Sequence, residues 1–453
     1  MRKLSVAFSV LLFLLLVIAI PTTADAGPEP QYWVDESTLP FDPVPGFEDA
    51  TRLWGIHNGA GYRIEVPANW NGDLVMWAHG YRGTGTRLFF SPEEVPLRPY
   101  LLANGYAWAA STYAKNDYNV SQGVKDTHAL ATFFRGQVGT PERTYLTGAS
   151  MGGHITAVSI EQYRNFYDGA LPVCGAIGDF ELFDFFLDFN VAAQQLGLGN
   201  SHFPVDPLTY PIVTAPQIKA NLEAFPGGWP LALNPDGLAF KQLVELRSGG
   251  DRPNFDEAWY FWNTFPEFGS GIPGNFLFDL GASTGMLPGR PGIIVDNTGI
   301  VYQTDLDPAL SPYEAALNEN IVRVSADPSA RRSQGLSNVP VVTGDLPVPV
   351  LTLHNLGDMF VPFHNEVVYA AEVAAQGKSD LLVQRAIRGV NHCGFTGVEL
   401  ATAFTDLVTW VEAGIKPAGD PVADPAAVAA PDFGCTFTDF ATPDGHLLPA
   451  PCP

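Results

Sequence analysis

A serine lies at the centre of the glycine-rich segment 148–152, which reads Gly-Ala-Ser-Met-Gly. The apolar run 144–148 predicts a strand before Ser150, and an apolar run typical of a helix follows it. A G-x-S-x-G segment on a sharp turn between strand and helix lifts the hydroxyl above the sheet, where it can attack a carbonyl group. Such matches also occur by chance in Gly-rich turns, but this position between strand and helix favours catalysis. We therefore predict that Ser150 is a nucleophile.

A serine nucleophile needs a base, and histidine is the side chain whose pKa lies nearest neutrality. His392 follows the last predicted strand, residues 381–386, from which it can reach over Ser150. The other histidines precede the serine, or lie in its helix, in a strand, beside the acid, in a long insertion or in the tail. These excluded residues are His57, His79, His128, His154, His202, His354, His364 and His446.

An acid that orients the base is expected at the carboxyl edge of the sheet, where active sites of open α/β sheets lie. The buried run 348–354 leads into a loop that carries Asp358. Asp345 and Asp380 each precede a predicted strand and so lie at the wrong edge. Asp358 is the predicted acid, and the alternative is a structural loop aspartate.

The developing oxyanion also needs donors. The apolar strand 74–78 ends in His79-Gly80, well before the serine. In this arrangement a backbone N–H after the early strand and the N–H that follows the nucleophile bind the oxyanion together. The predicted donors are the amides of Tyr81 and Met151, and the His79 side chain is expected to brace the loop.

Short apolar runs alternate with helical stretches and position these residues. This alternation predicts an α/β fold with a mostly parallel central sheet and helices on both faces. Residues 62–66 and 74–78 are expected to form an opening hairpin. The other expected strands are 106–111, 144–148, 170–174, 348–354 and 381–386, and the expected helices include 124–136 and 366–376.

The alternation breaks in a long segment rich in Phe, Trp, Pro and Gly. We expect a signal peptide (1–26), a first core segment (27–178), a cap insertion (179–346), a second core segment (347–415), and a Pro/Ala-rich linker with a cysteine-bearing tail (416–453). The cap aromatics either form its own core or line the route to Ser150, which favours apolar or aromatic acyl groups. They are Phe180, Phe183, Phe185, Phe186, Phe189, Trp229, Trp259, Tyr260, Phe261, Trp262, Phe265, Phe276 and Phe278.

Charge and the N-terminus predict an exported protein. Forty-eight acidic residues against 24 basic ones give a net charge of -24, which repels nucleic acids and anionic membranes. Arg2 and Lys3, a short apolar run and Ala24-Asp25-Ala26 are typical of a cleaved signal peptide. The alternative is an uncleaved anchor, but the run is short for a full span. We expect a secreted or periplasmic protein without a stable membrane anchor.

Four cysteines are present: Cys174, Cys393, Cys435 and Cys452. Their spacing lacks the paired CxxC of a zinc site, so disulfides are expected in an oxidising compartment. A Cys435–Cys452 bond would close a short loop and contribute about 3 kcal/mol. Three pairings are open, and no metal or cofactor is implied.

These motifs resemble those of serine esterases and lipases of the α/β-hydrolase superfamily, over residues 53–178 and 348–414. The Ser, acid, His order is the order of that superfamily rather than that of chymotrypsin or subtilisin. More narrowly, the chain is similar to secreted bacterial hydrolases related to phthalyl amidase. That similarity rests on Gly357-Asp358 with Val361-Pro362, Val383-Gln384-Arg385, and His392-Cys393 with Phe395-Thr396.

His-Cys after the last strand is also similar to tannases and feruloyl esterases, in which a cysteine beside the serine pairs with the one beside the histidine. Here Ala149 stands before the serine, which argues against a tannase-like preference. The resemblance implies that Cys174 takes over as the partner of Cys393.

The sequence thus predicts a serine hydrolase of small esters with apolar or aromatic acyl groups. Amide hydrolysis by the same residues is the nearest alternative, and a polyester depolymerase is another. A non-catalytic binding protein on the same fold would usually lack one of the three residues. The sequence does not predict the oligomeric state.

Overall fold

Eight strands form one sheet in the order β10-β9-β8-β7-β4-β6-β3-β2, in this computed structural model. Strand β3 is antiparallel to both neighbours, and all other pairs are parallel. Strands β4, β6, β8 and β9 are buried along their whole length, as parallel strands covered on both faces must be. The strands of this sheet are β2 (Thr51–His57), β3 (Ala60–Val66), β4 (Leu74–Ala78), β6 (Ala107–Ser111), β7 (Thr144–Ala149), β8 (Gly169–Val173), β9 (Val350–Asn355) and β10 (Leu382–Ile387).

The structure describes residues 30–265, 271–287, 292–332, 335–442 and 445–453. The signal peptide predicted for residues 1–26 lies outside the described residues. Gln31–Pro453 forms one unit, which contains the predicted core, insertion and tail. Within the described ranges, no helix combines the length and the apolar character needed to cross a membrane.

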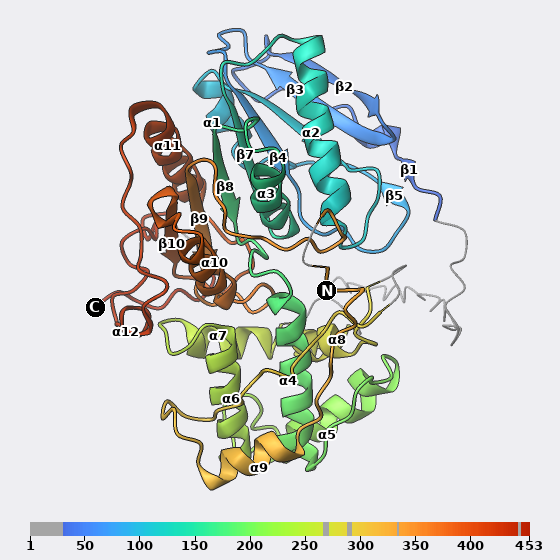
Figure 1. The fold of residues 1–453 in the computed structure, drawn as a ribbon, viewed down its shortest axis with the longest axis vertical. Helices are drawn as coiled ribbons and strands as arrows, with labels where there is room; N and C mark the ends of the chain where they lie inside the picture. Colours follow the sequence, from blue (N-terminus) through green and yellow to red (C-terminus); the bar gives the residue numbers. More distant parts are fainter. Residues whose placement is uncertain (1–29, 266–270, 288–291, 333–334, 443–444) are drawn as a thin grey trace, which may run out of the picture. The chain divides into compact units, whose positions relative to one another are not determined.

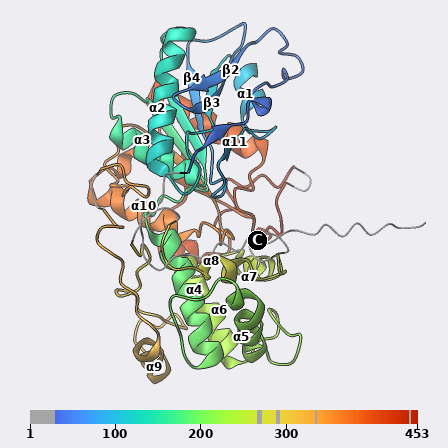
Figure 2. The same ribbon diagram turned by 90° about the vertical axis from the view of Figure 1, so that its right-hand side faces the viewer.

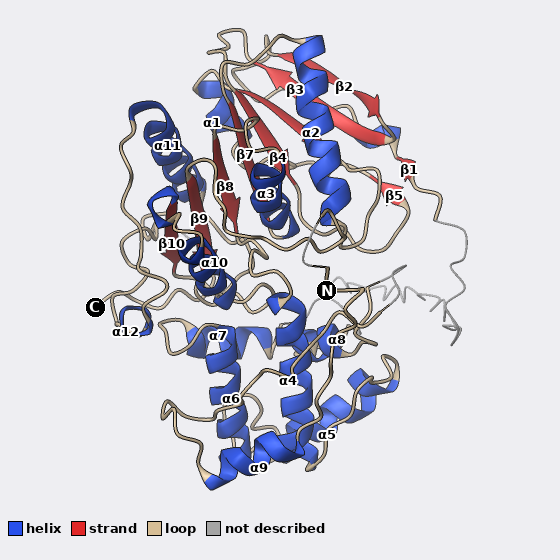
Figure 3. Cartoon of the chain, viewed as in Figure 1, coloured by secondary structure: helices blue, strands red, loops and turns tan. Residues whose placement is uncertain are grey.

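Helices cover both faces of the sheet, which confirms the predicted fold class (Figure 3). Helices α2 (Val120–Gln137), α3 (Met151–Gln162) and α10 (His364–Ala375) contribute to the apolar core on one face. Helices α1 (Arg98–Ala103) and α11 (Gly397–Ala413) contribute to the core on the other face. The remaining short elements are β1 (Trp33–Val34), η1 (Glu36–Thr38), β5 (Arg87–Leu88), η3 (Ser379–Leu381) and α12 (Pro425–Val428).

The segment between β8 and β9 is helical, although its sequence shows no regular period. Figures 1 and 2 both show these helices gathered at one end of the sheet. Phe189, Phe240, Phe278 and Trp259 pack edge to face at their centre, so part of the aromatic set forms the insertion's own core. The elements are α4 (Glu181–Leu198), η2 (Tyr210–Thr214), α5 (Ala215–Leu222), α6 (Pro235–Ser248), α7 (Phe255–Trp262), α8 (Phe276–Gly281) and α9 (Pro312–Asn320).

One predicted pairing is wrong. The strands expected at 62–66 and 74–78 exist as β3 and β4, but they do not form a hairpin with each other. Strand β3 pairs with β2 and β6, while β4 lies between β6 and β7. Strand β2, the first strand of this sheet along the chain, is not predicted from the sequence. It is an edge strand, and some of its residues, such as Trp54 and Ile56, are half exposed.

Candidate active site

Ser150 occupies a strained turn between β7 and α3. Its backbone has φ of 61°, a conformation that side chains with a Cβ rarely adopt. The flanking glycines make this turn feasible, because a Cβ on Gly148 would lie 2.4 Å from the Gly152 carbonyl oxygen. A Cβ on Gly152 would lie 2.0 Å from the carbonyl oxygen of Ala78. The serine is therefore presented at the carboxyl end of β7 by local backbone geometry.

Three side chains predicted from the sequence meet at this end of the sheet. Ser150 Oγ lies 2.9 Å from His392 Nε2, and His392 Nδ1 lies 2.6 Å from Asp358 Oδ2. The histidine follows β10 and the aspartate follows β9, so the sheet brings together residues that are far apart in the chain. Such a chain of hydrogen bonds passes a proton from hydroxyl to imidazole while the carboxylate fixes the imidazole tautomer.

The sheet order, its single antiparallel strand beside the edge strand, and the turn at Ser150 decide the fold. The chain has the α/β-hydrolase fold. In this fold Ser150 follows β7, Asp358 follows β9 and His392 follows β10.

The acid loop is held rigidly. Asp358 is fully buried, and its Oδ1 accepts the backbone N–H groups of Phe360 and Val361 at 2.9 and 3.0 Å. His354, also fully buried, lies 3.8 Å from Asp358 Oδ2 and 3.2 Å from a carboxylate oxygen of Glu366. Burial lowers the pKa of His354, but the hydrogen bond and charge of Glu366 outweigh it and raise that pKa above its ordinary value. A second histidine–carboxylate pair therefore lies beneath the acid.

Trp262, which the sequence does not mark as a site residue, joins the loops that carry Asp358 and His392. The Trp262 indole N–H, at the end of α7, lies 2.8 Å from the carbonyl oxygen of Gly357 and 3.0 Å from that of Val390. Gly357 precedes Asp358, and Val390 lies two residues before His392. Trp262 was singled out only as one of many cap aromatics, because nothing in a single sequence marks an indole that bridges two distant loops.

The loop after β4 carries His79 and Tyr81. The His79 ring stacks on Tyr113 with 3.9 Å between centroids, and burial, aided by the charge of Arg82, lowers its pKa well below the usual value. His79 is therefore neutral and packed within the loop. Arg82 pairs with the buried Glu94 and fixes the loop further. Tyr81 and Met151, whose amides are the predicted oxyanion donors, both line the cavity at Ser150.

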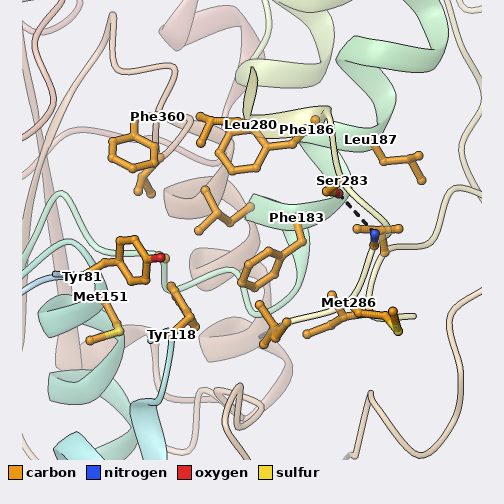
Figure 4. Close-up of a pocket in the computed structure, with 18 of the residues that line it drawn as sticks. Tyr81, Tyr118, Met151, Phe183, Phe186, Leu187, Leu280, Ser283, Met286 and Phe360 are labelled. Carbon is orange, nitrogen blue, oxygen red and sulfur yellow. Dashed lines mark hydrogen bonds between the residues drawn. The ribbon is translucent and has the colours of Figure 1, made fainter. Parts of the chain in front are cut away.

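An apolar cavity of about 350 Å³ opens at Ser150. Figure 4 shows Tyr81 and Met151 on one side of it and Phe186, Leu187 and Leu280 from the insertion on the other. No described residue that lines it carries a charged side chain. The cavity therefore suits a neutral apolar group, and Phe183 and Phe186 of the insertion contribute to its lining.

Two disulfides are present, Cys174–Cys393 and Cys435–Cys452. The first ties the end of β8 to the residue after His392. Cys174, His392 and Cys393 bring three potential metal ligands within 4.8 Å of one another. Sulfur atoms bonded to each other lack the thiolate charge that a metal ion requires, so this cluster does not fit a metal.

No protein-family model matches the chain. It is similar to an o-phthalyl amidase from Xanthobacter agilis, with 24% identity over 448 residues that cover 88% of this chain and 95% of the amidase.

Solved structures that share features with the chain include two from Aspergillus oryzae. Feruloyl esterase B has 14% identity and a TM-score of 0.46, with 81% of this chain and 82% of the esterase covered. A second esterase has 16% identity and a TM-score of 0.43, with 81% and 80% covered.

Proposed function

We propose that this protein is a serine hydrolase of carboxylic esters in which Ser150 forms an acyl-enzyme. The proposal depends on one observation, the two hydrogen bonds that connect Ser150, His392 and Asp358 at 2.9 and 2.6 Å. Serine is a weak nucleophile at its ordinary pKa and becomes effective beside an oriented base.

In the proposed reaction, Ser150 Oγ attacks the ester carbonyl carbon as His392 Nε2 takes the hydroxyl proton. The oxyanion accepts the N–H groups of Tyr81 and Met151, and His392 then gives its proton to the leaving alcohol. Water then loses a proton to His392 and attacks the acyl carbon. The bond from that carbon to Ser150 Oγ breaks, His392 returns the proton to Oγ, and the carboxylic acid leaves. Asp358 keeps the imidazole oriented and stabilises it while it is charged.

The preferred acyl group is apolar or aromatic. The cavity at Ser150 is lined by side chains such as Phe183, Phe186, Leu187 and Phe360, and its described lining is uncharged. A cavity of about 350 Å³ lies at the lower end of the usual range for small-molecule sites. We propose that the insertion 179–346 is a cap that admits small soluble esters in preference to a polymer surface.

Amide hydrolysis is the second candidate, because the chain is similar to an o-phthalyl amidase along most of both chains. A phthalyl group carries a carboxylate beside the reacting carbonyl, and a charged group is costly to place in an apolar cavity without a partner. The uncharged described lining therefore favours neutral acyl groups over phthalyl groups.

We also propose that the enzyme acts after export. Two disulfides favour an oxidising compartment, and the acidic composition disfavours nucleic acids as partners. The substrate is proposed to be a small molecule.

The test is hydrolysis of matched esters and anilides with acetyl, octanoyl, benzoyl and o-carboxybenzoyl groups, by wild type and Ser150→Ala. The proposal predicts turnover of benzoyl and octanoyl esters that disappears in the variant. Faster turnover of the o-carboxybenzoyl anilide would favour the amidase. Equal inactivity of both proteins on every substrate would favour a binding protein.

A further inference from the structure

The C-terminal tail, residues 416–453, is built into the loop that carries His392. We define the histidine loop as residues 388–396. The Val390 N–H donates to the Leu447 carbonyl at 3.1 Å, and the Arg388 N–H donates to Thr438 Oγ1 at 2.8 Å. Helix α12 and the C-terminus lie on the same side of the molecule as β10, which precedes this loop (Figure 1).

Arg388 anchors the start of the histidine loop in the tail. The residue is 1% exposed. Its guanidinium donates to backbone carbonyl groups of four tail residues, which are Pro431, Phe433, Ala450 and Pro451. A buried guanidinium without acceptors would be costly, so the tail is required for this end of the loop.

His446 holds the other end of the loop. Its Nδ1 lies 3.2 Å from the carbonyl oxygen of Gly394, and its Nε2 lies 2.9 Å from Glu399 Oε1. Gly394 lies two residues after His392, and Glu399 belongs to α11. The imidazole is 3% exposed, so water competes little for these bonds.

Both neighbours of the His446 ring are hydrogen-bond acceptors, so the ring satisfies both when each nitrogen carries a proton. Burial lowers the pKa of His446, but the hydrogen bond and charge of Glu399 raise it above the ordinary value. The charged groups that face the ring are Glu399 from α11 and Asp439 from the tail, and both favour the protonated form.

We propose that the tail is a positioning element of the active site, and that His446 holds the histidine loop where His392 can serve Ser150. This inference rests on the proposed function. The loop is held at Cys393 by the disulfide to Cys174 and at Gly394 by the tail. Cys435–Cys452 closes the tail segment that Arg388 and His446 contact. The tail therefore acts on the site through the histidine loop, since no described tail residue lines the cavity at Ser150.

The direction of the pH effect follows from protonation. The folded-state pKa of His446 is raised, so its contribution is fully present below the ordinary histidine pKa and is lost as pH rises through the folded value. When the ring is neutral, Nε2 keeps the proton, because it faces the Glu399 carboxylate, which is the stronger acceptor. Its Nδ1 lone pair then faces the Gly394 carbonyl oxygen, and the loop loses that support.

Two amide variants separate the two bonds. An asparagine amide nitrogen replaces Nδ1, so His446→Asn keeps the bond to Gly394 and does not titrate. A glutamine amide nitrogen replaces Nε2, so His446→Gln keeps only the bond to Glu399. Ile415→Ala is the control, because Ile415 is exposed and lies outside both the tail and the histidine loop.

The measurements are kcat, KM and the pH profile of kcat on an ester that wild type hydrolyses, at a temperature where all variants are folded. We expect His446→Gln to lower kcat roughly tenfold with little change in KM, since small displacements of catalytic groups have effects of this order or larger. We expect His446→Asn to keep most of kcat and to lose the alkaline decline of wild type. Ile415→Ala should match wild type.

Wild-type kcat and an unchanged pH profile in both His446 variants would overturn the proposal. Hydrogen exchange of the loop amides 388–396 gives a readout that is independent of activity, and faster exchange in His446→Gln than in Ile415→Ala is expected. Equal exchange would also overturn it. Failure of the proposed function is a different result, namely a wild-type protein that turns over no ester and whose Ser150 does not react with a fluorophosphonate.

Discussion

The nucleophile and its two partners are fixed in different ways. Ser150 is positioned by its immediate neighbours in the chain, through a positive φ and two glycines that let backbones approach. His392 and Asp358 are positioned by remote segments, namely an insertion tryptophan, a disulfide and the tail. One half of the site is thus specified locally and the other half by tertiary structure. The two halves should respond differently to substitution.

The largest effect on activity is expected at the local half. Gly152→Ala places a Cβ 2.0 Å from the backbone oxygen of Ala78, which cannot move without disrupting the sheet. We expect activity to fall more than about a hundredfold and the free energy of unfolding to fall by roughly 3 kcal/mol, as in overpacked sites. The measurements are kcat/KM and denaturant unfolding.

Gly136→Ala is the control for Gly152→Ala. Gly136 lies on an exposed turn of α2 with no atom within 4 Å of the new Cβ. Alanine should therefore be neutral or stabilise by up to about 1 kcal/mol. Equal tolerance at both glycines would contradict the local account of the serine turn.

The two disulfides should differ in stability and function. Cys174–Cys393 spans 219 residues and Cys435–Cys452 spans 17, so chain-entropy arguments give losses of about 5 and about 3 kcal/mol when each is replaced by a serine pair. We expect the first replacement to lower kcat as well, because Cys393 adjoins His392. Thermal unfolding and kcat of both double variants check this. A larger kcat loss from the tail disulfide would reverse the expected order.

Trp262→Phe removes the bridge between acid and base while keeping most of the buried ring. We expect kcat to fall roughly tenfold and stability to fall by about 1–2 kcal/mol, because two buried carbonyl groups lose a donor. Trp259→Phe is the matched control, since its indole N–H donates to Pro230 within the insertion. It should lose similar stability and keep kcat. Equal kcat losses would show that the insertion acts only through stability.

The smallest effect is expected at Asp179, where the chain enters the insertion. Burial raises the pKa of Asp179 to about 7, although the hydrogen bond donated by the Val342 N–H lowers that pKa in part. Because this pKa is raised in the folded protein, the stability that Asp179 contributes is fully present at a pH below the ordinary aspartate pKa. That contribution is lost as the pH rises toward 7. The free energy of unfolding of Asp179→Asn, relative to that of wild type, should therefore increase by roughly 1 kcal/mol from pH 4 to pH 8. This value is discounted because the Asp179 side chain keeps some solvent access.

Asp345→Asn is the control for Asp179→Asn. The hydrogen bond from Arg164 lowers the pKa of Asp345, so wild type gains stability as pH rises through the ordinary range and the variant does not. Thermal unfolding at pH 4 and pH 8 measures both differences. The same trend for both variants would contradict the assigned directions.

The contrast between the two halves also explains what the sequence could predict. The fold class followed from buried strand runs, and the serine turn followed from a local motif. The residues Asp358 and His392 were chosen by their position after strands, and the structure brings them together. Strand pairing at the edge failed because β2 is half-exposed and its partner depends on the whole sheet.

The supporting residues could not be predicted from one sequence. Trp262, Arg388 and His446 act through contacts with backbone carbonyl groups of distant segments, and such contacts leave no local pattern. His446 was set aside because it lies in the tail, although folding places it beside the loop of His392. Helices of the insertion were also missed, since aromatic residues surround them and obscure their period.

Reaction with a fluorophosphonate, followed by intact mass and peptide mapping, tests the central claim most directly. The account predicts one adduct per molecule, on Ser150, with no adduct in Ser150→Ala and much slower labelling in His392→Ala. Labelling at another residue, or equal rates in wild type and His392→Ala, would contradict the claim that Ser150, His392 and Asp358 act as one unit.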